Sequence, residues 1–310
     1  MRRQALQPIL DDSEDIMLSF LYAKRPAAQE LLGSIKAAKN LWLDSSGFQA
    51  GYGRSRNFSI FDVFDLQQEF ADIAFTFDLP TEPEQTFRNA ILSLTYSKGH
   101  EKKKPKLYAV VSHNGSTDTA KDLTRKYETY DFDGLALGST IPYGSSDMAE
   151  FFSLLSIVSR NTKKPIHAFG VGGFDAMYLL AFLGVSSFDS SRFLTAARSL
   201  HYLTPHGTLY VGNRYRNERG RAATEGALPC ACPACGKAGG FDFFQQHGAE
   251  PVGVLALHNY YAMRNELRLI EIAKRERWFP SLLEGRAKRS PRLRSVLNGI
   301  KKDYFVRNED

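Results

Sequence analysis

Three cysteines and one histidine have the spacing of a metal site. All three cysteines of the 310-residue chain, Cys230, Cys232 and Cys235, lie in the short segment LPCACPACGK. His258 follows in LALHNYY and completes the pattern C-x-C-x2-C-x22-H. Three thiolates and one imidazole form a closed tetrahedral zinc site, which stabilises structure and leaves no open position for a substrate. We therefore expect one structural Zn2+ ion here and the chemistry elsewhere.

Two alternatives apply to these residues. His247 competes as the fourth ligand, but it lies in the loose stretch FFQQHGAEP, whereas His258 opens an apolar run typical of a helix. Ordinary buried thiols are the other alternative, which the tight clustering of every cysteine disfavours. Disulfides are disfavoured by the odd count and by the short separations. This cysteine usage favours a reducing, cytoplasmic location.

Three aspartates, each at the end of a different apolar run, are the candidates for chemistry. Asp44 ends NLWLD, Asp78 ends DIAFTFD and Asp189 ends VSSFD. A single aspartate in such a place is explained as the cap of the following helix. Three that converge, beside glycines that let the backbone approach a ligand, indicate an active site, because carboxylates serve as nucleophiles and as general acids or bases.

The elements that must position these aspartates follow a βα rhythm. Strand-like runs occupy residues 16–22, 40–44, 72–78, 106–111, 134–138, 165–170 and 185–189, and amphipathic segments separate them. A unit of about thirty residues predicts an α/β fold, namely a (β/α)8 TIM barrel. A doubly wound sheet is the alternative, but no glycine-rich phosphate turn follows the first strand. In a barrel the functional residues lie at the carboxyl ends of the strands.

The pattern changes near Thr204, where glycine, arginine and turn residues become frequent. We expect a zinc-binding subdomain over about residues 204–275, inserted near the C-terminus of a single catalytic domain that spans residues 1–310. The basic stretch that follows predicts one or two helices that close the barrel.

Composition and charge favour a globular protein with a polyanionic partner. Hydrophobic residues make up 43% and charged residues 24% of the chain, no apolar run is long enough for a membrane span, and no signal-peptide core follows the first residues. The net charge is +6, and basic clusters lie at 102–104, 214–221 and 286–302. We therefore expect a nucleic-acid partner and no membrane.

Several segments resemble one enzyme family. LDSSGFQ (43–49) is similar to the DSGGFQ segment of the tRNA-guanine transglycosylases, and HAFGVGG (167–173) to their HLFGxG segment. The stretch 186–211 resembles the archaeal form of the segment that holds their nucleophilic aspartate. LPCACPAC with LHN (257–259) resembles their zinc site, and EGRAKRSPRL (284–293) their archaeal closing segment. The segments follow one another in family order.

This resemblance implies exchange of guanine in a polynucleotide for a 7-deazaguanine such as preQ0. It implies that Asp189 is the nucleophile of a covalent aspartyl intermediate, that Asp44 is the general acid and base, and that Asp78 reads the guanine edge. The target nucleotide must leave its stack to reach them. The further contacts that we expect are, for the base, Gln49, Ser112, His113, Gly138, Ser139, Gly170 and Gly172, and, for the nucleic-acid backbone, Arg214, Arg216, Arg219 and Arg221.

Departures from the family pattern bear on the polynucleotide. VVSHNG (110–115) stands in place of VQG, LGSTIPYG (137–144) in place of GGLAVGE, and Ser46 in place of a glycine. The family's N-terminal β-rich segment and the archaeal RNA-binding module have no counterpart. We therefore expect DNA slightly ahead of tRNA, as in the compact DNA-guanine transglycosylases of 7-deazapurine modification clusters.

Two other classes of function stay open at this point. The first is a non-catalytic nucleic-acid-binding partner subunit, although all three aspartates are present. The second is a metal-dependent barrel hydrolase, for which only His113 and His167 are available at the strand ends, and His167 precedes an Ala-Phe pair that indicates core. By analogy with the family, a homodimer or a complex with a partner protein is expected.

Overall fold

The computed structural model shows an α/β protein with two compact units. It describes residues 7–26, 28, 32, 35, 39–47, 58–99, 104–138, 145–205, 207–211, 230–238, 241, 244 and 252–306. The sheet unit comprises Ser13–Val171, Leu180–Asp189 and Ser295–Asp310, and the cysteine unit comprises Met1–Asp12, Gly172–Leu179 and Ser190–Arg294. The single domain over residues 1–310, with its subdomain near 204–275, stays a prediction.

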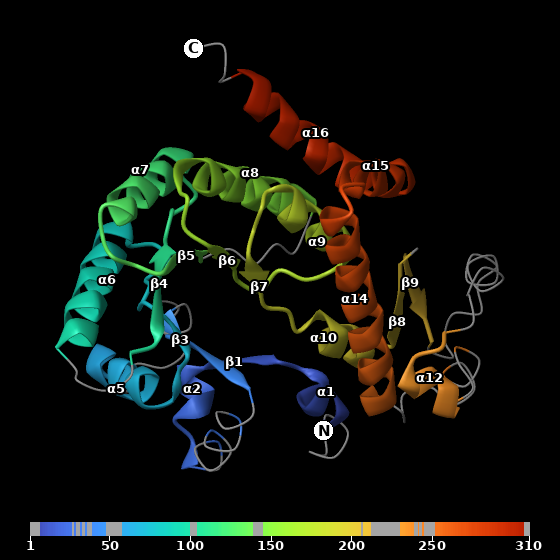
Figure 1. The fold of residues 1–310 in the computed structure, drawn as a ribbon, viewed down its shortest axis with the longest axis horizontal. Helices are drawn as coiled ribbons and strands as arrows, with labels where there is room; N and C mark the ends of the chain where they lie inside the picture. The colour runs from blue at the N-terminus through green and yellow to red at the C-terminus, as the bar shows by residue number, and fades with distance from the viewer. Residues whose placement is uncertain are drawn as a thin grey trace. The chain divides into compact units, whose positions relative to one another are not determined.

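The core of the sheet unit is a parallel sheet of seven strands that follow one another in chain order. The strands are β1 (Asp15–Ser19), β2 (Asn40–Asp44), β3 (Ile73–Phe75), β4 (Lys106–Val111), β5 (Gly134–Leu137), β6 (Ile166–Ala168) and β7 (Ser187–Phe188). Each lies within one of the predicted apolar runs or within one residue of it. The sheet is curled, with helices on its outer side (Figure 1), so the predicted α/β barrel class is confirmed.

Helices connect successive strands, as the amphipathic segments predicted. They are α2 (Phe20–Ala23), α5 (Ile60–Phe70), α6 (Pro83–Lys98), α7 (Thr117–Glu128), α8 (Ser145–Asn161) and, at the last two strands, α9 (Phe174–Phe182) and α10 (Arg192–Arg198). Local sequence sets their starts. Ser59 and Asp62 form a capping box at α5, Ser116 caps α7, and Pro83 is the first residue of α6.

The strands are apolar because helices and the sheet interior bury both of their faces. Leu41 and Leu43 of β2 and Val110 of β4 have no exposed surface. Such continuous apolar runs are typical of parallel strands. Polar residues follow the carboxyl ends of these apolar strands. The barrel prediction expects the functional residues at these ends.

Among the described residues the parallel sheet has seven strands rather than eight. The next strand in the chain, β8 (His201–Thr204), pairs antiparallel with β9 (Gly207–Tyr210) instead. Tyr202 and Leu203 of β8 are buried, and Tyr202 belongs to the core of the cysteine unit, so this strand serves the second core.

The cysteine unit is mainly helical. Its elements are α1 (Gln7–Asp12), α10, β8, β9, α12 (Pro233–Ala238), α14 (Val252–Arg275) and α15 (Phe279–Arg289), and α16 (Pro291–Val306) begins within it. Its core joins Tyr202, Phe244 and Leu255 to the buried cysteines. In the part of the chain that the structure describes, no helix is long and apolar enough to cross a membrane.

One residue of the expected basic surface is largely covered within the cysteine unit. Arg286 of α15 is 15% exposed and pairs with the buried Glu266 of α14 at 2.5 Å. Its Nε donates to the Tyr178 hydroxyl at 2.9 Å, and its Nη1 donates to the Pro205 carbonyl at 2.9 Å. These additional hydrogen bonds satisfy the guanidinium, as an ion pair away from solvent requires. One member of the basic cluster at 286–302 therefore joins elements of the cysteine unit instead of adding surface charge.

Candidate active site and metal centre

Asp44, the last residue of β2, is held by a strained turn. The Ser46 N–H donates to the Asp44 carboxylate at 3.2 Å, and Ser46 has φ = 61°. A side chain disfavours this left-handed conformation. The Ser46 hydroxyl accepts a hydrogen bond from the Leu21 N–H at 3.1 Å, which offsets part of the cost. Position 46 is the one at which the resembling family has glycine, and the conformation explains why.

Asp78 lies beyond β3, and its buried carboxylate fits there because two neighbouring residues are glycines without side chains. A Cβ on Gly47 would lie 2.0 Å from the Asp78 carbonyl oxygen, so no side chain fits there. A Cβ on Gly138 would lie 2.7 Å from Val110 and 3.2 Å from the Asp78 carboxylate. The Ser45 hydroxyl donates to Asp78 Oδ1 at 3.5 Å. The predicted site residue Gly138 is therefore beside Asp78.

Gln67 ties the two strands that carry Asp44 and Asp78. Its buried amide on α5 donates to the Leu43 carbonyl at 3.0 Å and to the Phe75 carbonyl at 2.9 Å. These carbonyls lie near the ends of β2 and β3. The sequence analysis missed this residue, although a glutamine on the apolar face of a predicted amphipathic helix is a signal for such a role.

The carboxyl groups of Asp44 and Asp78 have raised pKa values. Burial raises the pKa of Asp44 to about 7, and the charges of Asp78 and Asp189 add to this effect, against hydrogen bonds from Ser46 and Ser45 that lower it. Burial also raises the pKa of Asp78 to about 6, although hydrogen bonds lower it in part. The charges of Asp78 and Asp189 both act on Asp44, so the three predicted aspartates of the sheet unit lie within electrostatic reach of Asp44.

Asp189 follows β7 and is anchored through one oxygen. The Gly170 N–H donates to its Oδ1 at 2.7 Å, and Gly170 has φ = 65°. The side chain of Asp189 is about a third exposed, at 31%. The predicted site residue Gly170 thus contacts the candidate nucleophile itself, because glycine adopts the backbone conformation that directs this N–H.

Gly172 lies in a close backbone contact, and its predicted contact with the base stays a prediction. A Cβ at this position would lie 1.7 Å from the Ser190 hydroxyl and 3.1 Å from the Cβ of Arg192. The Ser190 hydroxyl in turn accepts a hydrogen bond from the Arg192 N–H at 3.1 Å. The glycine lets the segment after β6 lie against the start of α10.

Ser112 and His113, which follow β4, are both buried. The Ser112 hydroxyl lies 3.1 Å from the Leu79 carbonyl and 2.9 Å from the Pro80 carbonyl, so its hydrogen is directed at the loop that follows Asp78. His113 Nδ1 accepts from the Gly115 N–H at 2.9 Å. Burial lowers the pKa of His113, against raising effects of Glu150 and of the Gly138 backbone.

Six predicted site residues lie outside the described part of the chain. They are Gln49, Ser139, Arg214, Arg216, Arg219 and Arg221, and the competing ligand His247 is also among the undescribed residues.

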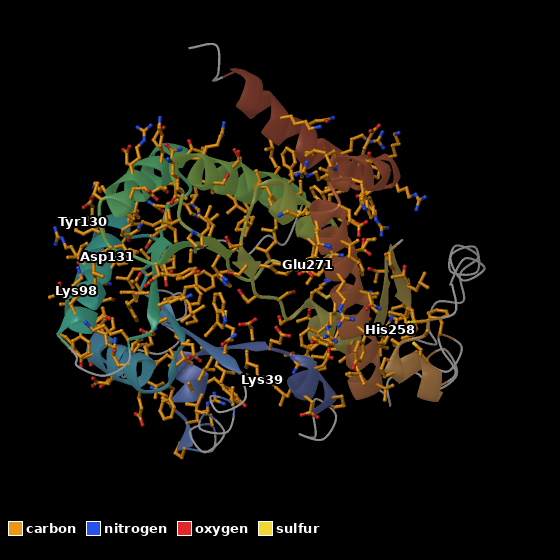
Figure 2. The ribbon with its side chains drawn as sticks, in the orientation of Figure 1. Lys39, Lys98, Tyr130, Asp131, His258 and Glu271 are labelled. Atoms are coloured by element: carbon orange, nitrogen blue, oxygen red, sulfur yellow. The ribbon has the colours of Figure 1, made fainter. Side chains whose placement is uncertain are left out.

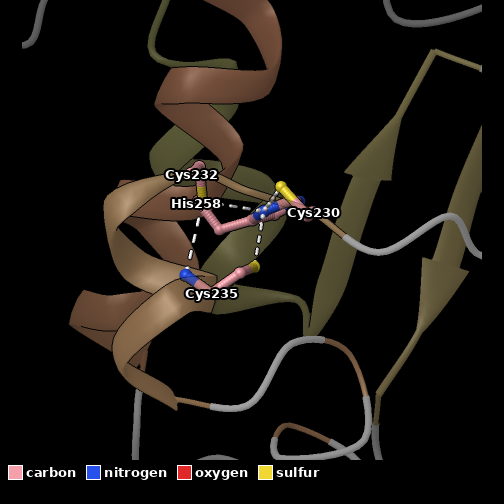
Figure 3. A group of neighbouring side chains, drawn as sticks. All are labelled: Cys230, Cys232, Cys235 and His258. Atoms are coloured by element: carbon pink, nitrogen blue, oxygen red, sulfur yellow. Dashed lines mark hydrogen bonds between the residues drawn. The ribbon is translucent and has the colours of Figure 1, made fainter.

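The predicted metal ligands come together in the cysteine unit (Figure 3). The ligand atoms of Cys230, Cys232, Cys235 and His258 all lie within 4.8 Å of one another. His258 Nδ1 lies 3.6, 3.6 and 3.2 Å from the three sulfurs in that order. A tetrahedral zinc ion places its sulfur and nitrogen ligands about 3.5 Å apart. These four residues can therefore bind one metal ion.

Neighbouring groups orient the ligands. His258 Nε2 lies 2.9 Å from the Leu203 carbonyl, which fixes this nitrogen as the donor and leaves the Nδ1 lone pair for a metal. Tyr202 stacks on the imidazole at 3.6 Å, and its hydroxyl lies 3.3 Å from the Cys235 sulfur. Asn259 accepts from the Leu203 N–H at 2.8 Å and so fixes β8 to α14. The sequence analysis did not identify Tyr202 or Asn259.

Comparisons with known proteins match most of this chain to one family. The sequence profile of the family described as queuine tRNA-ribosyltransferase matches residues 20–292. A tRNA-guanine(15) transglycosylase of Methanococcus maripaludis (strain C5) is 27% identical over 273 residues, which cover 83% of this chain and 40% of the relative. The enzymes of that name from Pyrococcus abyssi and Thermococcus onnurineus are each 25% identical over 86% of this chain, and over 45% and 46% of their own length. The chain thus spans less than half the length of these relatives.

Proposed function

Because the chain belongs to the queuine tRNA-ribosyltransferase family, we propose that it is a pentosyltransferase that exchanges guanine in a polynucleotide for a 7-deazaguanine base. The observation that carries the proposal is the gathering of Asp44, Asp78 and Asp189 at the carboxyl ends of parallel strands, with a pKa of about 7 for Asp44. A carboxyl group with this pKa both donates and accepts a proton near neutral pH.

The proposed reaction is a double displacement. The Asp189 carboxylate attacks C1′ while the bond from C1′ to guanine N9 breaks, and guanine leaves with the electron pair and takes a proton from Asp44. The incoming base then loses a proton to Asp44 and displaces Asp189 from C1′. A carboxylate suits the first step because it also stabilises the positive charge that develops at C1′.

Asp78 is proposed to read the base. A carboxylate accepts hydrogen bonds from the N1–H and the exocyclic amino group of guanine and rejects adenine. Its pKa of about 6 leaves it mostly ionised at neutral pH. The absence of side chains at Gly47 and Gly138 allows the backbone to lie close to this carboxylate. The Ser112 hydroxyl holds the loop after Asp78 by hydrogen bonds to the carbonyls of Leu79 and Pro80.

The metal at the Cys3His cluster is proposed to be Zn2+. A set of three thiolates and one imidazole suits zinc, and all four positions of a tetrahedral ion are filled by protein. Zinc would brace β8, α12 and α14 and supply no chemistry to the reaction. Among the described residues, this is the one group of three or more potential metal ligands within reach of one another, which gives the hydrolase alternative no support.

The relatives favour tRNA as the polynucleotide, because the family and the similar proteins are named for tRNA. The DNA preference predicted from the sequence gains no support from these names. DNA stays the second candidate on one observation, namely that VVSHNG and LGSTIPYG differ from the family segments beside the base. A homodimer, a partner protein and a cytoplasmic location stay predictions.

A base-exchange assay tests the proposal. Radiolabelled guanine is offered with bulk tRNA, duplex DNA and single-stranded DNA in parallel, and the variant Asp189→Ala is the control. We expect label in tRNA, and none with the variant. Label in DNA alone would restore the DNA preference and leave the mechanism standing. Wild-type protein that binds nucleic acid but exchanges no label into any of them would favour the non-catalytic partner subunit.

A further inference from the structure

His167, the middle residue of β6, is a polar ring in an apolar interior. Its side chain is almost fully buried, with 3% exposed. Its ring centroid lies 5.4 Å from that of Trp42 and 4.8 Å from those of Phe75 and Phe169. The sequence analysis assigned it to the core because an apolar Ala-Phe pair follows it. Burial alone does not explain a histidine, since a leucine or phenylalanine fills such a space without polar atoms to satisfy.

The two ring nitrogens of His167 face different partners, one on β7 and one just after it. Parallel pairing sets His167 opposite Ser187, and Nδ1 lies 3.0 Å from the Ser187 hydroxyl. Nε2 lies 3.5 Å from Oδ1 of Asp189 and has no hydrogen-bond partner within the described residues. A buried polar nitrogen without a partner is rare in folded proteins, so this one calls for an explanation.

We propose that His167 is a positioning residue for the nucleophile Asp189. The Ser187 hydroxyl donates to Nδ1, which keeps the proton on Nε2, and the Nε2–H points at Asp189 Oδ1. The contact of 3.5 Å is longer than a hydrogen bond. It closes by a small movement of the carboxylate when substrate is bound, because hydrogen bonds of catalytic groups tighten from the free to the bound state. The inference rests on the proposed base exchange.

The arrangement selects which oxygen of Asp189 reacts. The Gly170 N–H already donates to Oδ1, and the His167 Nε2–H is directed at the same atom. Oδ2 therefore forms the bond to C1′ as the bond to guanine N9 breaks. When the incoming base attacks C1′, the bond to Oδ2 breaks and the carboxylate regains its charge. Both donors stabilise that charge without transferring a proton.

Kinetic variants test this role. His167→Leu keeps an apolar volume and removes the donor, whereas His167→Gln places an amide nitrogen near the position of Nε2. We expect kcat of exchange to fall about 10- to 100-fold in the leucine variant, as for other residues that orient a reactive group. The glutamine variant should recover most of it, while KM for the polynucleotide stays unchanged in both. Ser187→Ala should give an intermediate loss, because the tautomer is no longer fixed.

Controls separate positioning from packing. His201→Gln alters a partly buried histidine of the cysteine unit and should keep the wild-type kcat, and thermal unfolding of each variant shows whether the fold is intact. If His167→Leu exchanges guanine at the wild-type rate while Asp189→Ala does not, the proposal is wrong. Equal losses in the leucine and glutamine variants, both folded, would also contradict it.

The ring nitrogens can be observed without any activity. Nitrogen-15 NMR of the wild-type protein, with the signal assigned by its loss in His167→Gln, should show Nε2 protonated and Nδ1 unprotonated. The Nε2 signal should shift in Asp189→Asn and stay unchanged in Asp131→Asn. A proton on Nδ1, or no response to Asp189→Asn, overturns the proposal. This result stands even if the wild-type protein exchanges no base, so failure of the proposed function is distinguished from failure of the positioning role.

Discussion

The cysteine cluster and the aspartate site use polar side chains in opposite ways. In the cluster, the ligand atoms face one another, and His258 and Asn259 bond to the backbone of β8. In the aspartate site, burial raises the pKa of two carboxyl groups, Ser46 has a left-handed conformation, and the Nε2 of His167 lacks a hydrogen bond among the described residues. One region satisfies its polar groups, and the other keeps them under strain.

This contrast is what a structural metal site and a reactive site require. Strained backbone and perturbed carboxyl groups persist only where the surrounding structure enforces them, and they gather at functional sites. Substitutions in the cluster should therefore reduce stability first, and substitutions among the aspartates should reduce activity first.

The largest expected effect is the loss of exchange in Asp189→Ala. Removal of a nucleophile lowers the rate by about 10⁴-fold or more. The base-exchange assay measures this, and thermal unfolding should show a stable protein with its metal retained. Asp131→Ala is the matched control, since Asp131 is exposed at the outer side of the sheet unit (Figure 2) and should exchange at the wild-type rate. Residual exchange near wild type would remove Asp189 from the mechanism.

The second effect is on the metal. Cys232→Ser and His258→Ala should each reduce bound zinc from one ion per chain to less than one and lower the free energy of unfolding, because zinc binding contributes directly to folding. Elemental analysis and thermal unfolding measure the two effects. His201→Ala should keep its metal. If the cluster variants lost base exchange while their stability stayed unchanged, the metal would be catalytic. The distinction between a structural cysteine cluster and a reactive aspartate site would then be wrong.

Third, Gly47→Ala should displace Asp78. The new methyl group would meet the Asp78 carbonyl oxygen, and overpacking of this kind costs about 3 kcal/mol. We expect exchange to fall about 10- to 100-fold as the base-reading carboxylate moves. Gly285→Ala is the control, because nothing lies within 4 Å of a Cβ at that position. Wild-type exchange by Gly47→Ala would show that the position of Asp78 is unimportant.

Fourth, Asp78→Asn should stabilise the protein at pH 8. The folded-state pKa of about 6 exceeds the ordinary value of 3.8, so the folded state binds more protons between these values and stability falls as pH rises through them. The asparagine cannot ionise and should gain about 3 kcal/mol at pH 8, and nothing at pH 3. Chemical denaturation at both pH values measures this. A gain that is equal at both would exclude ionisation as its cause.

The smallest effect concerns Ser46. Ser46→Gly relieves the left-handed conformation and loses the hydrogen bond from Leu21, so the two terms of about 1 kcal/mol each should nearly cancel. Ser46→Ala keeps the strain and loses the bond, and should cost about 1 kcal/mol more than Ser46→Gly. Thermal unfolding of the pair measures the difference. Equal stability would show that the conformation carries no cost.

Much of this architecture could be predicted from local sequence. The seven parallel strands lie at the apolar runs because strands buried on both faces must be apolar. The cysteine spacing predicted the ligand cluster, since the short separations leave few other arrangements. The aspartates gather because the carboxyl ends of parallel strands share one edge of the sheet.

The remainder depends on contacts between distant segments. The partner of His167 follows from the register of β6 against β7, which local sequence does not specify, so the residue was assigned to the core. The hydrogen bonds of the Ser112 hydroxyl to the Leu79 and Pro80 carbonyls also join distant segments, and its expected contact with the base stays a prediction. Arg286 was counted as basic surface, although it forms an ion pair with the buried Glu266 and is only 15% exposed.

The most direct test of the division between the two regions is to map the covalent intermediate. Wild-type protein is incubated with tRNA and DNA in separate reactions, denatured, digested and examined by mass spectrometry for a peptide that carries a nucleotide. We predict the adduct on Asp189, its absence in Asp189→Ala, and its persistence when zinc is partly depleted from protein that is still folded. An adduct on Asp44, or exchange that proceeds without any adduct, would contradict the assignment of Asp189 as the nucleophile.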